Sequence, residues 1–143
     1  VNLTKKCPII LKNLKVTFAD KMEERLHRFV FARSGKRIEV KGYVAEVGVH
    51  NGRKFLGPVR RLDLTKTGTE VSTEEAVVLK DYVANDMIAV VWLVFVQVEM
   101  EGVASRICIG WLPIVATQSH GDKGPILIGE YSLPMKCANP MMA

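Results

Sequence analysis

The chain has 143 residues, a length that suits one domain with a single buried core. Hydrophobic residues make up 48% of it and charged residues 24%, which is too apolar for an intrinsically disordered segment. The net charge is +5, but residues 1–66 hold 16 Lys and Arg against 6 Asp and Glu, and residues 67–143 hold 4 against 9. The two halves therefore carry +10 and −5, and the first half predicts a basic surface.

The first predicted element is a strand at residues 8–18. Its second part alternates apolar and polar side chains, with Leu14, Val16 and Phe18 on one face. This alternation places every second residue on the same side of a sheet.

A short helix is predicted next, at residues 20–32. Asp20 and Glu23 have the spacing of a capping box at its start, and the glycine within residues 33–37 breaks the pattern at its end. One apolar stripe follows the helical period, at Met22, Leu26, Phe29 and Val30.

From residue 38 onward, strand patterns alternate with turn residues. Strands are predicted at 38–49, 55–64, 74–83, 87–100, 103–115 and 125–135. The breaks lie at 50–52, 66–72, 84–86, 101–102 and 119–124. Short strands without alternating helices indicate an all-β antiparallel sandwich of about eight strands, into which the helix is inserted near the N-terminus.

The longest apolar run is Met-Ile-Ala-Val-Val-Trp-Leu-Val-Phe-Val-Gln-Val, residues 87–98. A bilayer-spanning helix needs about twenty apolar residues, so this run predicts a core strand instead. We expect apolar side chains to be buried on both of its faces. One face holds Val90, Trp92, Val94 and Val96, and the other holds Val91, Leu93 and Phe95.

Two further features bear on context. The three cysteines, Cys7, Cys108 and Cys137, are odd in number and widely spaced, which favours a reducing cytoplasmic compartment over a disulfide framework. The chain begins at Val1 without an initiator methionine, so we expect residues 1–143 to be a single domain cut from a larger multidomain protein.

The stretch at 47–64 raises the question of catalysis. Asn51 and Gly52 predict a two-residue type I′ hairpin turn, which would make His50 the last residue of a strand. A catalytic His50 would need a nucleophile or an orienting carboxylate, and neither stands at a recognisable spacing. The stretch also lacks the pattern of a phosphate-binding loop. We therefore expect a turn histidine and no enzyme.

Metal and cofactor sites are not expected either. His27, His50 and His120 show no paired spacing with one another or with the cysteines. Calcium needs several carboxylates that converge in loops, so scattered aspartates predict a calcium-independent domain. The aspartates are Asp20, Asp63, Asp81, Asp86 and Asp122.

The basic residues remain as the candidate binding surface. They are Lys36, Arg37, Lys41, Arg53, Lys54, Arg60 and Arg61. Arg60 and Arg61 point to opposite faces of a regular strand, so all seven can join one patch only if a bulge intervenes. Tyr43 and Phe55 are the few interleaved aromatics, and binding to nucleic acid therefore ranks below binding to protein or lipid. The same charges equally fit solvated strand faces that need no partner.

Several motifs resemble the C2-like region of the nephrocystin-4 family, and they follow the same order over most of the chain. They are Asn-Leu-Lys-Val-Thr-Phe-Ala-Asp-Lys-Met-Glu-Glu-Arg-Leu at 13–26, Val-Gly-Val-His-Asn-Gly-Arg-Lys-Phe at 47–55, the run at 76–100, the strand at 106–115 and the ending at 132–140. Gly-Val-His-Asn-Gly and the Trp-x-Pro of Trp111 to Pro113 are the specific ones; the others are patterns that different sandwiches share.

This resemblance implies a C2-like β-sandwich in a non-catalytic scaffold of the ciliary transition zone or basal body. Its partners would be other ciliary or basal-body proteins, and its location would be cytoplasmic and cytoskeletal, at the base of a cilium or flagellum. No catalytic residues come with the family. The alternative is a peripheral membrane module whose basic half binds anionic phosphoinositides, for which four to eight Lys or Arg on one face would suffice. The oligomeric state is left open by the sequence.

Overall fold

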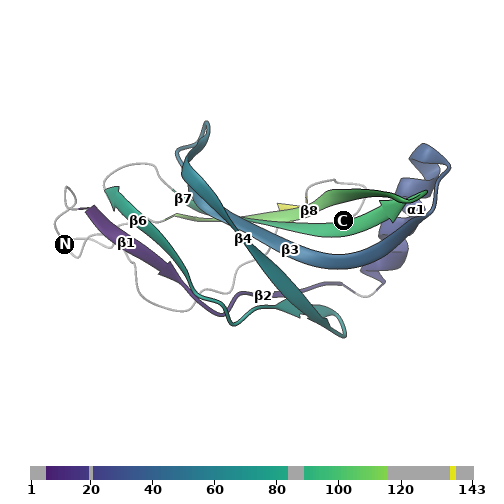
Figure 1. Ribbon diagram of the computed structural model, residues 1–143, viewed down its shortest axis with the longest axis horizontal. Helices are drawn as coiled ribbons and strands as arrows, with labels where there is room; N and C mark the ends of the chain where they lie inside the picture. The colour runs from purple at the N-terminus through teal and green to yellow at the C-terminus, as the bar shows by residue number, and fades with distance from the viewer. Residues whose placement is uncertain (1–5, 20, 84–88, 116–135, 138–143) are drawn as a thin grey trace.

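The computed structural model describes residues 6–19, 21–83, 89–115 and 136–137, which form an antiparallel β-sandwich with one short helix (Figure 1). The helix, α1 (Met22–Ser34), lies between the second and third strands, so the all-β class and the place of the helix are confirmed. The described strands are β1 (Lys6–Leu11), β2 (Lys15–Thr17), β3 (Ile38–His50), β4 (Phe55–Thr67), β5 (Glu70–Ser72), β6 (Val77–Val83), β7 (Ala89–Met100), β8 (Val103–Val115) and β9 (Lys136–Cys137).

One layer is a curled sheet with the order β2-β5-β4-β3-β7-β8-β9, in which neighbouring strands run antiparallel. β3 and β7 lie at its centre. Across their ladder, Val47 lies opposite Trp92 and Val49 lies opposite Val90, and all four side chains are buried. Such cross-strand pairs of β-branched and aromatic residues are the units that stabilise a sheet.

The second layer covers the inner face of this sheet. β1 and β6 form a separate two-stranded sheet, and in Figure 1 they lie toward the end of the molecule opposite to α1. Val77 and Leu79 of β6 and Leu26 of α1 belong to the same buried cluster as the central strands. Met22 and Val30, from the predicted helical stripe, are partly buried and pack against this cluster.

The apolar strand β7 is buried mainly on one face. Trp92 and Val96 are buried on the inner face, as predicted. On the outer face Phe95 is buried, but Val91 and Leu93 are half-buried. The prediction of burial on both faces was therefore wrong for these two residues.

The strand predicted at 8–18 is two strands in two different sheets. Asn13 has a left-handed backbone (φ 55°), which ends β1 before β2 begins. β1 pairs with β6, whereas β2 pairs with β5. The predicted alternation of half-buried Leu14, Val16 and Phe18 with exposed neighbours is confirmed.

α1 begins and ends two residues later than the predicted range 20–32, and its N-cap also differs from the prediction. The N-cap is Lys21, with a left-handed backbone (φ 62°) and no capping bond from its side chain, so the predicted capping box was wrong. Asp20 lies outside the described residues. At the other end, Gly35 adopts φ 70° and its N–H donates to the carbonyl of Phe31 at 2.8 Å, which confirms the predicted glycine stop.

The turn between β7 and β8 is the tight one predicted at 101–102. Glu101 and Gly102 have φ values of 51° and 79°, and Met100 lies opposite Val103 across the ladder. Positive φ at both central residues is the mark of a type I′ hairpin turn. The predicted breaks at 84–86 and 119–124 and the predicted strand at 125–135 lie outside the described residues.

Candidate basic interaction surface

The His-Asn-Gly segment lies at the tip of the β3–β4 hairpin, which projects from the sheet in Figure 1. His50 is the last residue of β3 and lies opposite Phe55, the first residue of β4. The connection is therefore a four-residue loop, 51–54, and not the predicted two-residue turn. Gly52 has a positive φ of 95°, but Asn51 does not, so the type I′ prediction was wrong.

The side chain of Asn51 organises this loop, which we call the hairpin tip (residues 51–54). Its Oδ1 accepts hydrogen bonds from the backbone N–H groups of Arg53 and Lys54, both at 2.9 Å. Its own N–H donates to the carbonyl of Lys54 at 3.1 Å. Asparagine side chains commonly replace a backbone acceptor in this way, which is why a longer loop competes with the type I′ turn.

His50 serves the hairpin tip as a structural residue. Its Nδ1 accepts the N–H of Gly52 at 3.0 Å, and its ring packs edge-on against the ring of Phe55, with centroids 4.9 Å apart. An accepting Nδ1 carries no proton, so this contact fixes the ring tautomer. In the part of the chain that the structure describes, no carboxylate or nucleophile is hydrogen-bonded to His50.

Three of the seven candidate cations have acidic neighbours. Lys36 pairs with Glu101 at 3.5 Å, and Arg61 pairs with Asp63 at 3.8 Å. Lys41 contacts two carboxylates, Glu39 at 2.9 Å and Glu99 at 3.6 Å. The hydrogen bond to Glu39 raises the pKa of Lys41 above its ordinary value.

The seven cations do not form one patch. Lys36, Arg37 and Lys41 lie before or early in β3, whereas Arg53 and Lys54 follow its last residue. β3 has 13 residues, which at about 3.3 Å per residue separates the two groups by roughly 30–40 Å. Arg53 and Lys54 therefore form a small basic group at the hairpin tip, apart from Lys36, Arg37 and Lys41.

A bulge in β4 decides where Arg60 and Arg61 lie. Val49 pairs with Leu56, but Val47 pairs with Arg60, so extra residues of β4 loop out around Gly57 (φ 74°). The bulge precedes Arg60, and Arg61 lies opposite Glu46 on the next rung. The two arginines therefore point to opposite faces, as alternation predicts.

Sequence reasoning missed a polar network between α1 and the sheet. The carboxylate of Glu23 accepts hydrogen bonds from the hydroxyl of Tyr43 and from Nζ of Lys66, the latter at 2.7 Å. The bonds from Lys66 and Tyr43 lower the pKa of Glu23, while burial raises the pKa of Tyr43. A tyrosine on the inner face of a strand needs a partner for its hydroxyl, and that was the available signal.

Over residues 6–19, 21–83, 89–115 and 136–137, no group of three or more His, Cys, Asp or Glu could hold a metal ion. Within the same ranges, no helix is long and apolar enough to cross a membrane. Cys108 is a free thiol, and burial raises its pKa.

Comparisons of the chain with protein-family models, with curated proteins and with solved structures find no match. The resemblance to the nephrocystin-4 family and the C2-like assignment therefore stay predictions. What the structure establishes is an antiparallel β-sandwich whose β3–β4 hairpin presents two exposed cations on an ordered loop.

Proposed function

We propose that the chain is a non-catalytic interaction module that binds an acidic surface of a protein partner through its hairpin tip. The observation that carries this proposal is the pair Arg53 and Lys54. Both are exposed, both have backbone N–H groups held by Asn51, and neither has an ion-pair partner within the described residues. A loop that is already ordered loses less conformational entropy on binding, which favours affinity.

The distribution of charge supports a protein partner over an anionic membrane. Membrane association through basic residues needs about four to eight of them near the surface. Here Lys36, Lys41 and Arg61 already pair with carboxylates, and the hairpin tip holds two cations. Binding to phosphoinositide remains the competing proposal, and the experiment below includes it.

The contacts of His50 support the non-catalytic part of the proposal. Its Nδ1 is occupied by the N–H of Gly52, and one side of its ring meets Phe55. Because Nδ1 accepts this bond, the proton of the neutral ring lies on Nε2, and no lone pair is left to take a proton from a substrate. The contacts of His50 instead hold the loop.

The proposed context is a cytoplasmic scaffold at the base of a cilium or flagellum. This part rests on the resemblance of residues 13–26, 47–55 and 76–100 to the nephrocystin-4 family. Scaffold modules bind other proteins and carry out no reaction. A hairpin tip with two exposed cations suits such binding.

Proximity labelling in a ciliated cell tests the proposal. The chain would be compared with Arg53→Glu/Lys54→Glu and with His50→Ala, each first shown to be folded. We expect the charge reversal to lose labelled neighbours of the basal body, because like charges would then face each other. His50→Ala should keep them. If the charge-reversed variant labels the same neighbours as the unaltered chain, the hairpin tip is not the contact site.

Flotation with vesicles that contain phosphatidylinositol 4,5-bisphosphate separates the two partner classes. Under the proposal, the chain stays with the unbound protein at physiological salt. If the unaltered chain floats with the vesicles and the Arg53→Glu/Lys54→Glu variant does not, the partner of the hairpin tip is a membrane and not a protein.

A further inference from the structure

An exposed phenylalanine lies on the outer side of α1, at the opposite end of β3 from the hairpin tip. The apolar stripe of this helix packs toward the core through Leu26, but Phe31 leaves 49% of its surface exposed. A single exposed apolar residue is common and signifies nothing alone. The residues around Phe31 make it notable.

Two exposed arginines neighbour Phe31, one by its spacing on the helix and one by contact with the ring. Arg28 is exposed and lies one helical turn earlier, at a spacing that makes the two residues neighbours on the helix surface. The guanidinium of Arg37 lies over the Phe31 ring, 5.9 Å from its centroid. We call Arg28, Phe31 and Arg37 the helix-end surface.

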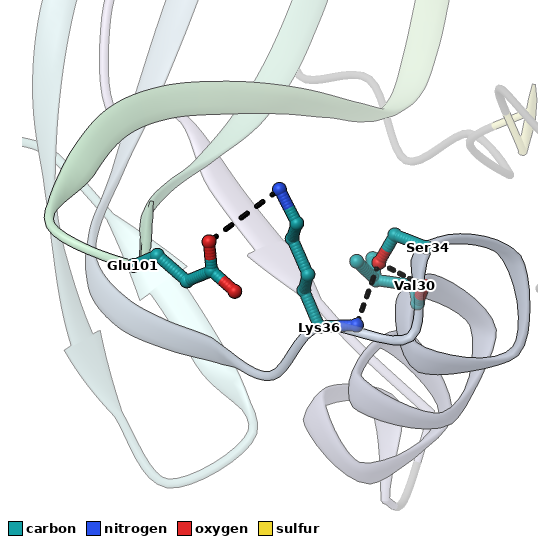
Figure 2. A network of polar contacts seen from close by, with 4 residues as sticks. All are labelled: Val30, Ser34, Lys36 and Glu101. Atoms are coloured by element: carbon teal, nitrogen blue, oxygen red, sulfur yellow. Dashed lines mark hydrogen bonds and ion pairs between the residues drawn. The ribbon is translucent and has the colours of Figure 1, made fainter.

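The return of Arg37 toward the helix follows from an ordered chain reversal. Gly35 turns the backbone in the left-handed conformation and donates its N–H to the carbonyl of Phe31. Figure 2 shows the neighbouring contacts: Ser34 Oγ donates to the carbonyl of Val30 at 2.8 Å and accepts the N–H of Lys36 at 3.1 Å. Nζ of Lys36 reaches Glu101 in the β7–β8 turn at 3.5 Å, as the same view shows.

These contacts give the helix-end surface a definite chemistry. A guanidinium presents several N–H donors in one plane and binds carboxylates with two hydrogen bonds at once. The exposed ring of Phe31 offers apolar contact area beside these charges. Phe and Arg are also both enriched in the buried centres of protein interfaces.

We propose that the helix-end surface docks an acidic protein segment in which Asp or Glu residues flank one apolar side chain. The apolar side chain would pack on Phe31, and the flanking carboxylates would pair with Arg28 and Arg37. A protein segment fits better than a bilayer, because a helix that lies in a membrane interface buries its whole apolar stripe there. In α1, Met22, Leu26 and Val30 of that stripe already pack in or against the protein core.

A second docking surface would make the chain a connector between two partners. The hairpin tip and the helix-end surface lie beyond opposite ends of the 13-residue strand β3. Two partners bound at these places would not compete for the same space.

Fluorescence anisotropy with a labelled synthetic peptide tests this proposal. The probe carries glutamates on both sides of one leucine, and a second peptide has serine in place of the leucine. We expect the chain to bind the leucine peptide more tightly, and Arg28→Glu/Arg37→Glu to weaken that binding roughly tenfold. Phe31→Ser should remove the preference for leucine. Lys12→Glu/Arg60→Glu, which changes the net charge equally at exposed positions outside both surfaces, should leave the affinity and the preference intact.

Three results would overturn the proposal. The first is equal affinity of the unaltered chain for the two peptides. The second is equal weakening by the two double variants, which would mean attraction by net charge alone. The third is binding to phosphatidylinositol 4,5-bisphosphate vesicles, lost in Arg28→Glu/Arg37→Glu, without binding to the peptide. Loss of proximity labelling in the hairpin variant concerns the other surface, so the two proposals can fail separately.

Discussion

The hydroxyl of Tyr43 on β3 donates a hydrogen bond to the carboxylate of Glu23 on α1. The same carboxylate accepts a bond from Lys66 of β4, whose ammonium also lies 5.9 Å from the centroid of the Tyr43 ring. Glu23 therefore joins the helix to two neighbouring strands of the main sheet.

Replacing this carboxylate should loosen the helix. In Glu23→Gln the side chain keeps its shape but loses its charge, and hydrogen bonds to charged groups contribute about 1.5–3 kcal/mol. Because Glu23 is about one-third exposed, we expect a smaller loss of unfolding free energy, about 1 kcal/mol. Urea denaturation measures it. Glu24→Gln, at the exposed neighbouring position, is the control and should change stability by less than about 0.5 kcal/mol.

The contribution of Glu23 should depend on pH. Its pKa is lowered from 4.5 in the folded chain, chiefly by the bond from Lys66, so folding favours its ionised form. The stabilisation is therefore present above pH 4.5 and is lost as the pH falls through the lower folded pKa. The difference in stability between the unaltered chain and Glu23→Gln should shrink from pH 7 toward pH 3. A difference that stays constant over this range would contradict the role of the charge.

Trp92 should be essential to the core. It is 5% exposed and lies between Val47 of β3 and Leu112 of β8 on the central strands. Truncation of a buried Trp or Phe to Ala typically costs about 3–5 kcal/mol, a large part of the stability of a small domain. We expect Trp92→Ala to be insoluble or molten by near-ultraviolet circular dichroism. Leu93→Ala, on the half-buried outer face, should stay folded; a native-like melt for Trp92→Ala would show that β7 is not central.

Calcium should leave the thermal stability unchanged. A ligand that binds the native state alone must raise its melting temperature by mass action. No carboxylate cluster exists among the described residues to bind the ion. Differential scanning fluorimetry with millimolar calcium and then chelator measures this, and a reversible upward shift would contradict the expectation.

Strands defined by local pattern could be predicted, whereas pairings between distant segments could not. β8 runs from Val103 to Val115, as the sequence indicates, because a largely apolar run follows the tight turn at Glu101 and Gly102. The split of residues 8–18 was not visible, because β1 and β2 take different partners far along the chain, β6 and β5. The prediction of a two-residue turn at the hairpin tip failed for a local reason, because the Asn51 side chain provides the hydrogen bonds of a longer loop.

The basic surface shows the limit of counting charges. The two halves of the chain differ by fifteen charges, +10 against −5. In the sheet, however, β3 of the first half lies beside β7 of the second, and this register brings Lys41 next to Glu99. Lys36 likewise meets Glu101, and Arg106 meets Glu46 at 2.8 Å. Charge excess along a sequence therefore overstates charge excess on the folded surface.

The pairing of β3 with β7 also bears on how fast the chain folds. β3–β4 and β7–β8 are hairpins of strands that follow each other in the chain. β3 and β7 are far apart in the chain, and Ile38 at the start of β3 pairs with Met100 at the end of β7. Contacts so distant along a chain require costly loop closure, and domains rich in them fold in milliseconds to seconds. We expect two early hairpins whose docking limits the rate. Stopped-flow refolding would then show Val47→Ala slowing folding more than Val103→Ala, because Val47 meets Trp92 of β7 only when the hairpins join, whereas Val103 pairs with Met100 inside one hairpin.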